Sequence, residues 1–125
     1  MIRGVDHIDI GVRDLAASEK FFETMGFEVV RRTEHGGVAV ELQCPGDDDY
    51  PIIELHAESE SRPVGIHHIA FKVDDINETH EQLVLKGLEF QSAPNYVPPT
   101  QRWLASLFDP DGGKFQFVQV DPVEG

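Results

Sequence analysis

Two histidines and two residues with side-chain oxygens recur at nearly equal distances along this chain of 125 residues. His7 and His68 are 61 residues apart, and Glu54 and Gln116 are 62 apart. Two imidazoles, one carboxylate and one amide oxygen form a plausible ligand set for a divalent metal ion. Because the set contains no thiolate, it suits Mn, Fe, Co, Ni or Zn in a site that keeps one or two positions open.

The spacing of the histidines belongs to a longer repeat. The segment 6–15, which begins Asp6-His7-Ile8, is echoed by the segment 67–76, which begins His67-His68-Ile69. In both copies a histidine opens a run that alternates polar and apolar residues and then meets an aspartate before an amphipathic stretch. The pattern predicts a strand, a turn and a helix in each half of the chain.

The elements that must position these residues follow from periodicity, helix caps and glycine stops. Asp14 and Asp75 are predicted N-caps, and Gly26 and Gly87 are predicted to end the two helices. The first half is predicted to have strands at 5–12, 27–32, 38–43 and 52–56 and a helix at 15–25. The second half is predicted to have strands at 66–73, 103–108 and 114–120 and a helix at 76–86. The segment Tyr96-Val97-Pro98-Pro99 is predicted to be a turn or lid-like loop.

This order predicts an α+β fold of two tandem βαβββ modules within one domain, residues 1–125. The first module covers about 1–57, a linker about 58–64, and the second module about 65–120. In a strand, successive side chains point to opposite faces. His7, Glu54, His68 and Gln116 each alternate with aliphatic or aromatic neighbours, so we expect all four to face away from the helices and converge.

Other residues compete for these roles. His67 precedes His68, but only His68 shares the parity and register of His7. His56 is the reserve ligand because it lies on the same face as Glu54, whereas His35 in a glycine turn and His80 on a helix are expected to be structural or surface residues. Cys44 has no basic neighbour to activate a thiolate and no cysteine to pair with.

Composition limits the partners. The chain has 10 Lys and Arg against 23 Asp and Glu, a formal net charge of −13. Such a surface repels polyanions, so we expect no nucleic-acid partner. No apolar stretch resembles a signal peptide or a membrane span, and we therefore expect a soluble, cytoplasmic protein without a membrane partner.

Several of these segments together resemble the vicinal oxygen chelate (VOC) superfamily, which includes glyoxalase I, methylmalonyl-CoA epimerase, extradiol dioxygenases and bleomycin resistance proteins. The resemblance extends over nearly the whole chain. It is carried by the motifs Asp6-His7-Ile8, Ile53-Glu54-Leu55, His67-His68-Ile69-Ala70-Phe71 and Asp109-Pro110-Asp111-Gly112.

The resemblance implies a cup-shaped mixed sheet around one metal ion. It places the ligands at the positions of His7, Glu54, His68 and Gln116. Many members of the superfamily have Glu where this chain has Gln116, and Gln cannot act as a base. If a proton is removed beside a carbonyl, Glu54 is therefore the leading catalytic candidate.

The preferred functional hypothesis is a metal-dependent lyase or isomerase of the glyoxalase I or methylmalonyl-CoA epimerase type. In that reading, adjacent oxygens of a small-molecule substrate chelate the ion, which stabilises an enediolate. An Fe(II)-dependent extradiol-type dioxygenase is the second hypothesis. A non-catalytic antibiotic-binding or small-molecule-binding resistance protein is the third. The resemblance also implies a homodimer.

Overall fold

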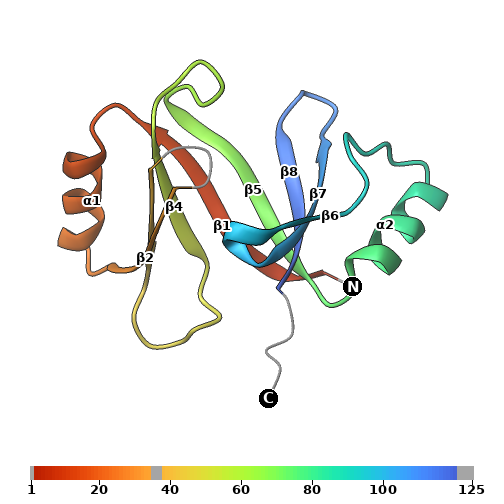
Figure 1. Ribbon diagram of the computed structural model, residues 1–125, viewed down its shortest axis with the longest axis horizontal. Coiled ribbons are helices and arrows are strands. Elements are labelled where there is room, and N and C mark those ends of the chain that lie inside the picture. The colour runs from red at the N-terminus through yellow and green to blue at the C-terminus, as the bar shows by residue number, and fades with distance from the viewer. Residues whose placement is uncertain (1, 35–37, 121–125) are drawn as a thin grey trace. The chain divides into compact units, whose positions relative to one another are not determined.

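In the computed structural model, residues 2–34 and 38–120 are described, and they form eight strands, two α-helices and one 3₁₀ turn (Figure 1). In chain order the elements are β1 (Ile2–Val12), α1 (Leu15–Thr24), β2 (Glu28–Thr33), β3 (Ala39–Gln43), β4 (Ile52–Ala57), β5 (Gly65–Val73), α2 (Ile76–Leu85), β6 (Asn95–Val97), η1 (Pro98–Thr100), β7 (Arg102–Phe108) and β8 (Lys114–Val120). This confirms the predicted α+β class.

The chain divides into two compact units. The first unit is Asp6–Ile69, and the second consists of the described residues of Met1–Val5 and Ala70–Gly125. Neighbouring strands follow the order β2-β3-β4-β1-β5-β8-β7-β6. Within this order β1 pairs with β4 in parallel, whereas the β2–β3, β3–β4, β6–β7 and β7–β8 pairs are antiparallel.

In the first unit, helix α1 contacts β2 and β4 (Figure 1). The side chain of Asp14 accepts a hydrogen bond from the Ala17 amide and caps the helix, and Gly26 follows its end with a φ of 105°. The core consists of aliphatic and aromatic residues of the strands and α1: Val40, Leu42 and Leu55, with Ile10, Val12, Leu15, Phe22, Phe27, Val29 and Ile53 packed against them. The apolar face of β1 and β4 therefore meets the helix, as the alternation predicted.

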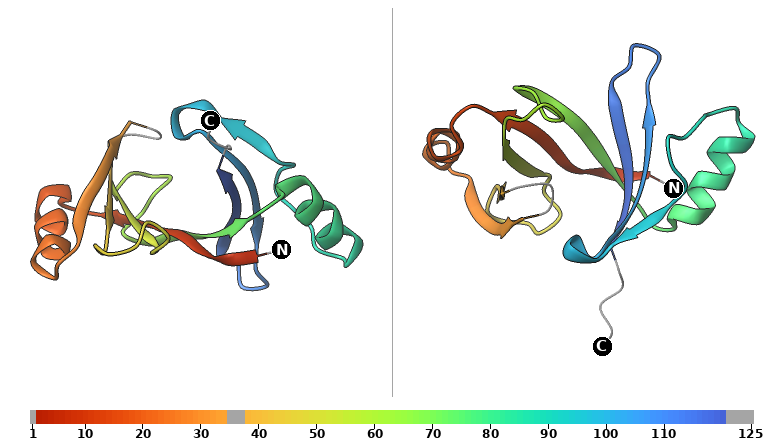
Figure 2. Two further views of the ribbon diagram at one scale, coloured as in Figure 1. Left: turned by 90° about the horizontal axis from the view of Figure 1, so that it is seen from below. Right: turned by 45° about the horizontal axis from the view of Figure 1, so that its top comes forward.

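In the second unit, helix α2 lies beside β7 and β8, as two further views also show (Figure 2). Asp75 accepts a hydrogen bond from the Glu78 amide and caps the helix, as predicted. Its core contains Val73, Ile76, Ala105 and Phe117 with five partly buried neighbours, among them Phe71 and Phe90.

The segment after α2 differs from the prediction. Tyr96 lies in strand β6 rather than in a loop, because Asn95–Val97 pairs with β7 and the ring of Tyr96 packs against Trp103 at 5.4 Å between centroids. The two prolines then begin the 3₁₀ turn, which the fixed φ of proline permits. Phe90 makes a single bridge to Leu107.

Neither described α-helix has the length or the apolar run needed to cross a membrane. The predicted glycine turn containing His35 lies outside the described residues.

Candidate metal centre

A buried polar surface covers the face of the first unit's strands opposite α1. The parallel register of β1 and β4 sets Asp9 beside Glu54, and the antiparallel register of β3 and β4 sets Glu41 on the other side of Glu54. Asp9 is 1%, Glu41 3% and Glu54 9% exposed. Buried carboxylates need hydrogen bonds, opposite charges or a metal ion to offset the loss of hydration.

His7 and His68 meet on this surface. Their Nε2 atoms face one another at 3.1 Å, and both side chains are buried. The Nδ1–H of His7 donates to the Oδ2 of Asp6 at 2.7 Å, which leaves the Nε2 of a neutral His7 free to accept. Asp6 therefore orients the imidazole as carboxylates do behind metal-binding histidines.

The distance between the two Nε2 atoms fits a shared ion. Ligands about 2.1 Å from an ion and at right angles to each other are about 3 Å apart. The Oε2 of Glu54 lies 3.8 Å from the same Nε2 of His7. The two imidazole nitrogens are thus placed to hold a divalent ion, and one carboxylate oxygen of Glu54 lies near the nitrogen of His7. An ion bound there would displace the proton between the two Nε2 atoms.

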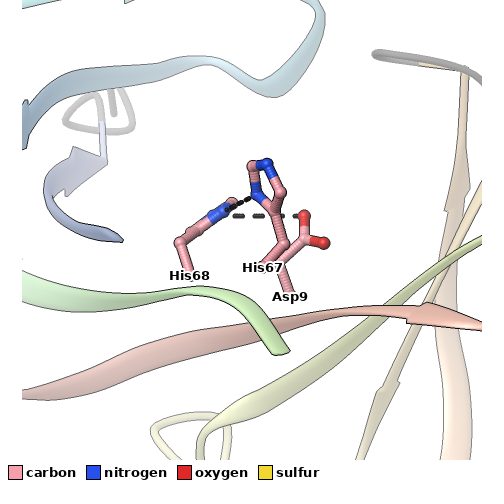
Figure 3. Close-up of side chains that lie close together, drawn as sticks. All are labelled: Asp9, His67 and His68. Carbon is pink, nitrogen blue, oxygen red and sulfur yellow. Dashed lines mark hydrogen bonds and ion pairs between the residues drawn. The ribbon is translucent and has the colours of Figure 1, made fainter. Parts of the chain in front are cut away.

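His67 contacts His68 from its other side (Figure 3). The two Nδ1 atoms are 2.8 Å apart, and the Nε2 of His68 is 4.0 Å from the Oδ2 of Asp9. Asp9, His67 and His68 can also bring one ligand atom each within 4.8 Å of one another. Because His67 is hydrogen-bonded to the Nδ1 of His68, we expect the Nε2 of His68 to be the ligand atom and His67 to orient the ring.

A second imidazole–carboxylate pair lies beside Glu54. The Nδ1 of His56 is 3.2 Å from the Oδ1 of Asp9, and its Nε2 is 3.5 Å from the Oε1 of Glu54. The Nη1 of Arg62 donates to the Oδ2 of Asp9 at 2.8 Å. Asp9, Glu54 and His56 form another trio whose ligand atoms lie within 4.8 Å of one another.

The combined effect of burial and neighbouring charges raises the pKa values of Glu54 and His56 and lowers the pKa of Asp9. Burial raises the pKa of Glu54 and outweighs the lowering by His7, and the negative charges of Asp9 and Glu41 add to the rise. Burial also acts to raise the pKa of Asp9, but the hydrogen bond from His56 and the nearby positive charges lower it overall. The pKa of His56 is raised because Asp9 outweighs the effect of burial.

Arg62 comes from the segment predicted to be a linker. Ser59 and Arg62 exchange backbone hydrogen bonds of 3.0 and 3.1 Å, which fold the segment back. Gly11 makes room for it, since a Cβ at that position would lie 2.3 Å from the carbonyl oxygen of Pro63. Because Gly11 has no side chain, the backbone at Pro63 can lie close to β1, and this close approach brings Arg62 to Asp9.

The structure thus brings three of the four predicted ligands, His7, Glu54 and His68, onto one surface of the first unit. Gln116 belongs to the second unit, where it is 8% exposed in β8 opposite Ser106. Its inclusion in the ligand set stays a prediction.

Residues outside the predicted set also belong to this surface. Asp9 lies on the same strand face as His7, so alternation could have found it, and His56, the predicted reserve ligand, lies on the same strand face as Glu54. Glu41 shares a face with Glu54 only through the β3–β4 register, and Arg62 carried no signal in the sequence.

Comparison with known proteins gives the family. Residues 4–117 match the model of the Glyoxalase/Bleomycin resistance protein/Dioxygenase superfamily. The uncharacterized protein YwbC of Bacillus subtilis is 30% identical over 125 residues, which cover 95% of this chain and 99% of YwbC.

Two further relatives have named activities. A probable chloroplastic lactoylglutathione lyase of Arabidopsis thaliana is 26% identical, with 94% of this chain covering 36% of that protein. A variant of Streptomyces coelicolor methylmalonyl-CoA epimerase, solved with 2-nitronate-propionyl-CoA, superimposes with a TM-score of 0.79 at 23% identity, covering 100% of this chain and 99% of the epimerase. The second likeness shows a shared fold. Since the family model matches most of the chain, this protein belongs to the Glyoxalase/Bleomycin resistance protein/Dioxygenase superfamily, also called the VOC superfamily.

Proposed function

We propose that this protein is a metal-dependent isomerase or lyase that removes a proton beside a carbonyl group of a small-molecule substrate. The observation that carries the proposal is the facing pair of Nε2 atoms of His7 and His68, 3.1 Å apart, with the Glu54 carboxylate beside them. A divalent Mn, Fe, Co, Ni or Zn ion held there would polarise two adjacent substrate oxygens and stabilise the enediolate.

Glu54 is the proposed proton acceptor. A general base works best when its pKa approaches the working pH, and burial with two neighbouring carboxylates raises the pKa of Glu54 in that direction. One of its oxygens faces His7, while the other faces His56. The Oε2 of Glu54 thus lies near the proposed metal ligand His7, whereas its Oε1 contacts His56.

Glu41 is a second carboxylate on this surface that such a reaction could use. It pairs with Glu54 across β3 and β4, and its Oε2 accepts a hydrogen bond from the Nε of Arg31 at 3.0 Å. The ion pair compensates the buried charge of Glu41. Substitution of each carboxylate by its amide separates the two candidates.

The printed names of two similar proteins supply the substrate classes that we propose to test. The epimerase complex contains an acyl-CoA analogue, and a lactoylglutathione lyase acts on a glutathione adduct. We therefore propose acyl-CoA epimers and glutathione hemithioacetals as the first substrates to test. Both place a carbonyl or hydroxyl oxygen beside an acidic carbon–hydrogen bond.

Hydrogen exchange with solvent tests the proposal directly. Protein loaded with each of the five dications is incubated with either substrate class in D₂O, and deuterium at the α-carbon is measured by mass spectrometry. We expect deuterium incorporation with at least one combination of dication and substrate. Incorporation should be lost in Glu54→Gln, which retains an oxygen ligand but cannot accept the proton. Loss in Glu41→Gln with retention in Glu54→Gln assigns proton removal to Glu41 instead.

Two other outcomes contradict the proposal. Cleavage of catechols with ferrous iron and oxygen, without α-exchange on any acyl-CoA or hemithioacetal, indicates a dioxygenase. A protein that takes up none of the dications yet binds small molecules indicates a binding protein.

A further inference from the structure

His56 is a buried histidine with a carboxylate at each ring nitrogen. It is 2% exposed, its Nδ1 lies 3.1 Å from the Oδ2 of Asp9, and its Nε2 lies 3.5 Å from the Oε1 of Glu54. A side chain so enclosed has no surface to offer a substrate. Any role of His56 in the proposed reaction must therefore act through its two neighbours.

Asp9 contacts the Nδ1 of His56 and fixes the orientation of the ring. Asp9 itself is fixed by the Nη1 of Arg62, whose side chain is 17% exposed. The backbone hydrogen bonds between Ser59 and Arg62, and the contact of Pro63 with Gly11, set the position from which Arg62 reaches inward. With Asp9 accepting at Nδ1, the remaining Nε2 of His56 is directed at Glu54.

The two oxygens of Glu54 have different neighbours. Oε2 lies toward the Nε2 of His7 at 3.8 Å, whereas Oε1 lies toward the Nε2 of His56 at 3.5 Å. Of the two oxygens, only Oε1 therefore faces the Nε2 of His56. This contact occupies Oε1 and leaves Oε2 for an ion beside His7 and His68.

We propose that His56 is a positioning residue that makes Glu54 a one-oxygen metal ligand. The chain of contacts runs from Arg62 through Asp9 and His56 to Glu54. This inference rests on the proposed function, because it presumes an ion between His7 and His68. It adds the group that sets the orientation of the carboxylate, whose Oε2 would have to leave the ion before it accepts a proton from the substrate.

The same residues form a trio that could be taken for a second metal site. The guanidinium of Arg62 argues against that use, since it places a fixed positive charge 2.8 Å from the Oδ2 of Asp9. The other oxygen of Asp9 is 3.2 Å from the Nδ1 of His56. Both oxygens of Asp9 thus already have positively charged or donating neighbours.

Substitution of His56 by amide side chains of two lengths tests its two ring nitrogens separately. His56→Asn places a polar group near the position of Nδ1, where it can still contact Asp9, but it is too short for Glu54. His56→Gln places an amide nitrogen near the position of Nε2 and keeps a donor for Glu54. Leu55→Val is the matched control, because Leu55 is the adjacent, fully buried residue on the opposite, helix-facing side of β4.

The experiment titrates each metal-free protein with Co²⁺ and records calorimetric affinity, stoichiometry and the visible spectrum, with thermal stability measured in parallel. We expect one Co²⁺ per chain in the parent protein and about 10- to 100-fold weaker binding with an altered spectrum in His56→Asn. His56→Gln should stay closer to the parent protein in both readouts. Leu55→Val should lose stability but keep the parent affinity and spectrum.

An unchanged affinity and spectrum in His56→Asn overturns the inference, and so do equal losses of affinity in His56→Asn and Leu55→Val. Two Co²⁺ ions in the parent protein and one in His56→Asn make His56 a ligand of its own site, which also overturns it. A parent protein that binds no Co²⁺, Mn²⁺, Fe²⁺, Ni²⁺ or Zn²⁺ overturns the proposed function together with this inference.

Discussion

The Nε2 atoms of His7 and His68 lie 3.1 Å apart although the two residues are 61 positions apart in the chain. Each imidazole also has a partner at Nδ1, Asp6 for His7 and His67 for His68. In the metal-free protein one proton can bridge the two Nε2 atoms. A metal ion that replaces it would gain two ligands that are already oriented.

Removal of either facing imidazole is predicted to abolish stoichiometric metal uptake. His7→Ala and His68→Ala each leave the ion with one imidazole nitrogen fewer. His67→Ala should leave uptake largely intact, because it removes only the partner behind His68. Metal content after loading and desalting, measured by inductively coupled plasma mass spectrometry, checks this. An equal loss from His67→Ala would make His67 the ligand.

Gln116→Glu is predicted to be tolerated and to tighten metal binding. If Gln116 is a ligand, a carboxylate in its place adds negative charge to the site. Competition with a chromophoric chelator measures the change in affinity. Weaker binding by Gln116→Glu would count against Gln116 as a ligand.

Glu54→Gln is predicted to stabilise the metal-free protein at neutral pH. The folded-state pKa of Glu54 is raised, so the folded protein binds this proton more tightly than the unfolded chain and its ionised form opposes folding. The cost is full above the raised pKa and is relieved as the pH falls through it. The thermal midpoint of Glu54→Gln should therefore exceed that of the parent protein at pH 7, by a margin that shrinks on acidification. A lower midpoint at pH 7 would show that the ionised carboxylate stabilises the fold.

Gly11→Ala is predicted to destabilise the first unit by about 1–3 kcal/mol, because overpacking displaces neighbouring backbone. The added Cβ would lie 2.3 Å from the Pro63 carbonyl oxygen. Chemical denaturation of the metal-free protein measures the loss. Ala17→Gly, in the exposed part of α1, is the control for a change of one methyl group, and its cost should be close to the helix propensity difference of about 1 kcal/mol. Unfolding of Gly11→Ala at the parent midpoint would mean that the segment near Pro63 shifts freely.

Much of the fold could be predicted because alternation, caps and stops agree with one another. Asp14 and Asp75 cap their helices, and Gly26 and Gly87 follow with positive φ, as expected. Strand β6 was missed because it has three residues and is followed by two prolines, so its pairing with β7 rather than its composition defines it.

The candidate site could be predicted only in part. The alternation of side chains between the two faces of β1 and of β4 can be read from neighbouring residues, and it was enough to select His7 and Glu54. The partners of these residues depend on strand register and on how the segment before β5 folds back, which brings Arg62 to Asp9 over 53 positions. The homodimer and the use of Gln116 remain predictions.

X-ray absorption at the metal edge tests the central claim most directly. Protein loaded with one equivalent of Co²⁺ or Zn²⁺ should show the multiple-scattering pattern of two imidazoles together with oxygen ligands at about 2.0–2.2 Å. The imidazole contribution should fall by half in any metal retained by His68→Ala. A bound ion with no imidazole scattering, or one whose spectrum is the same after His68→Ala, would contradict a metal centre built on His7 and His68.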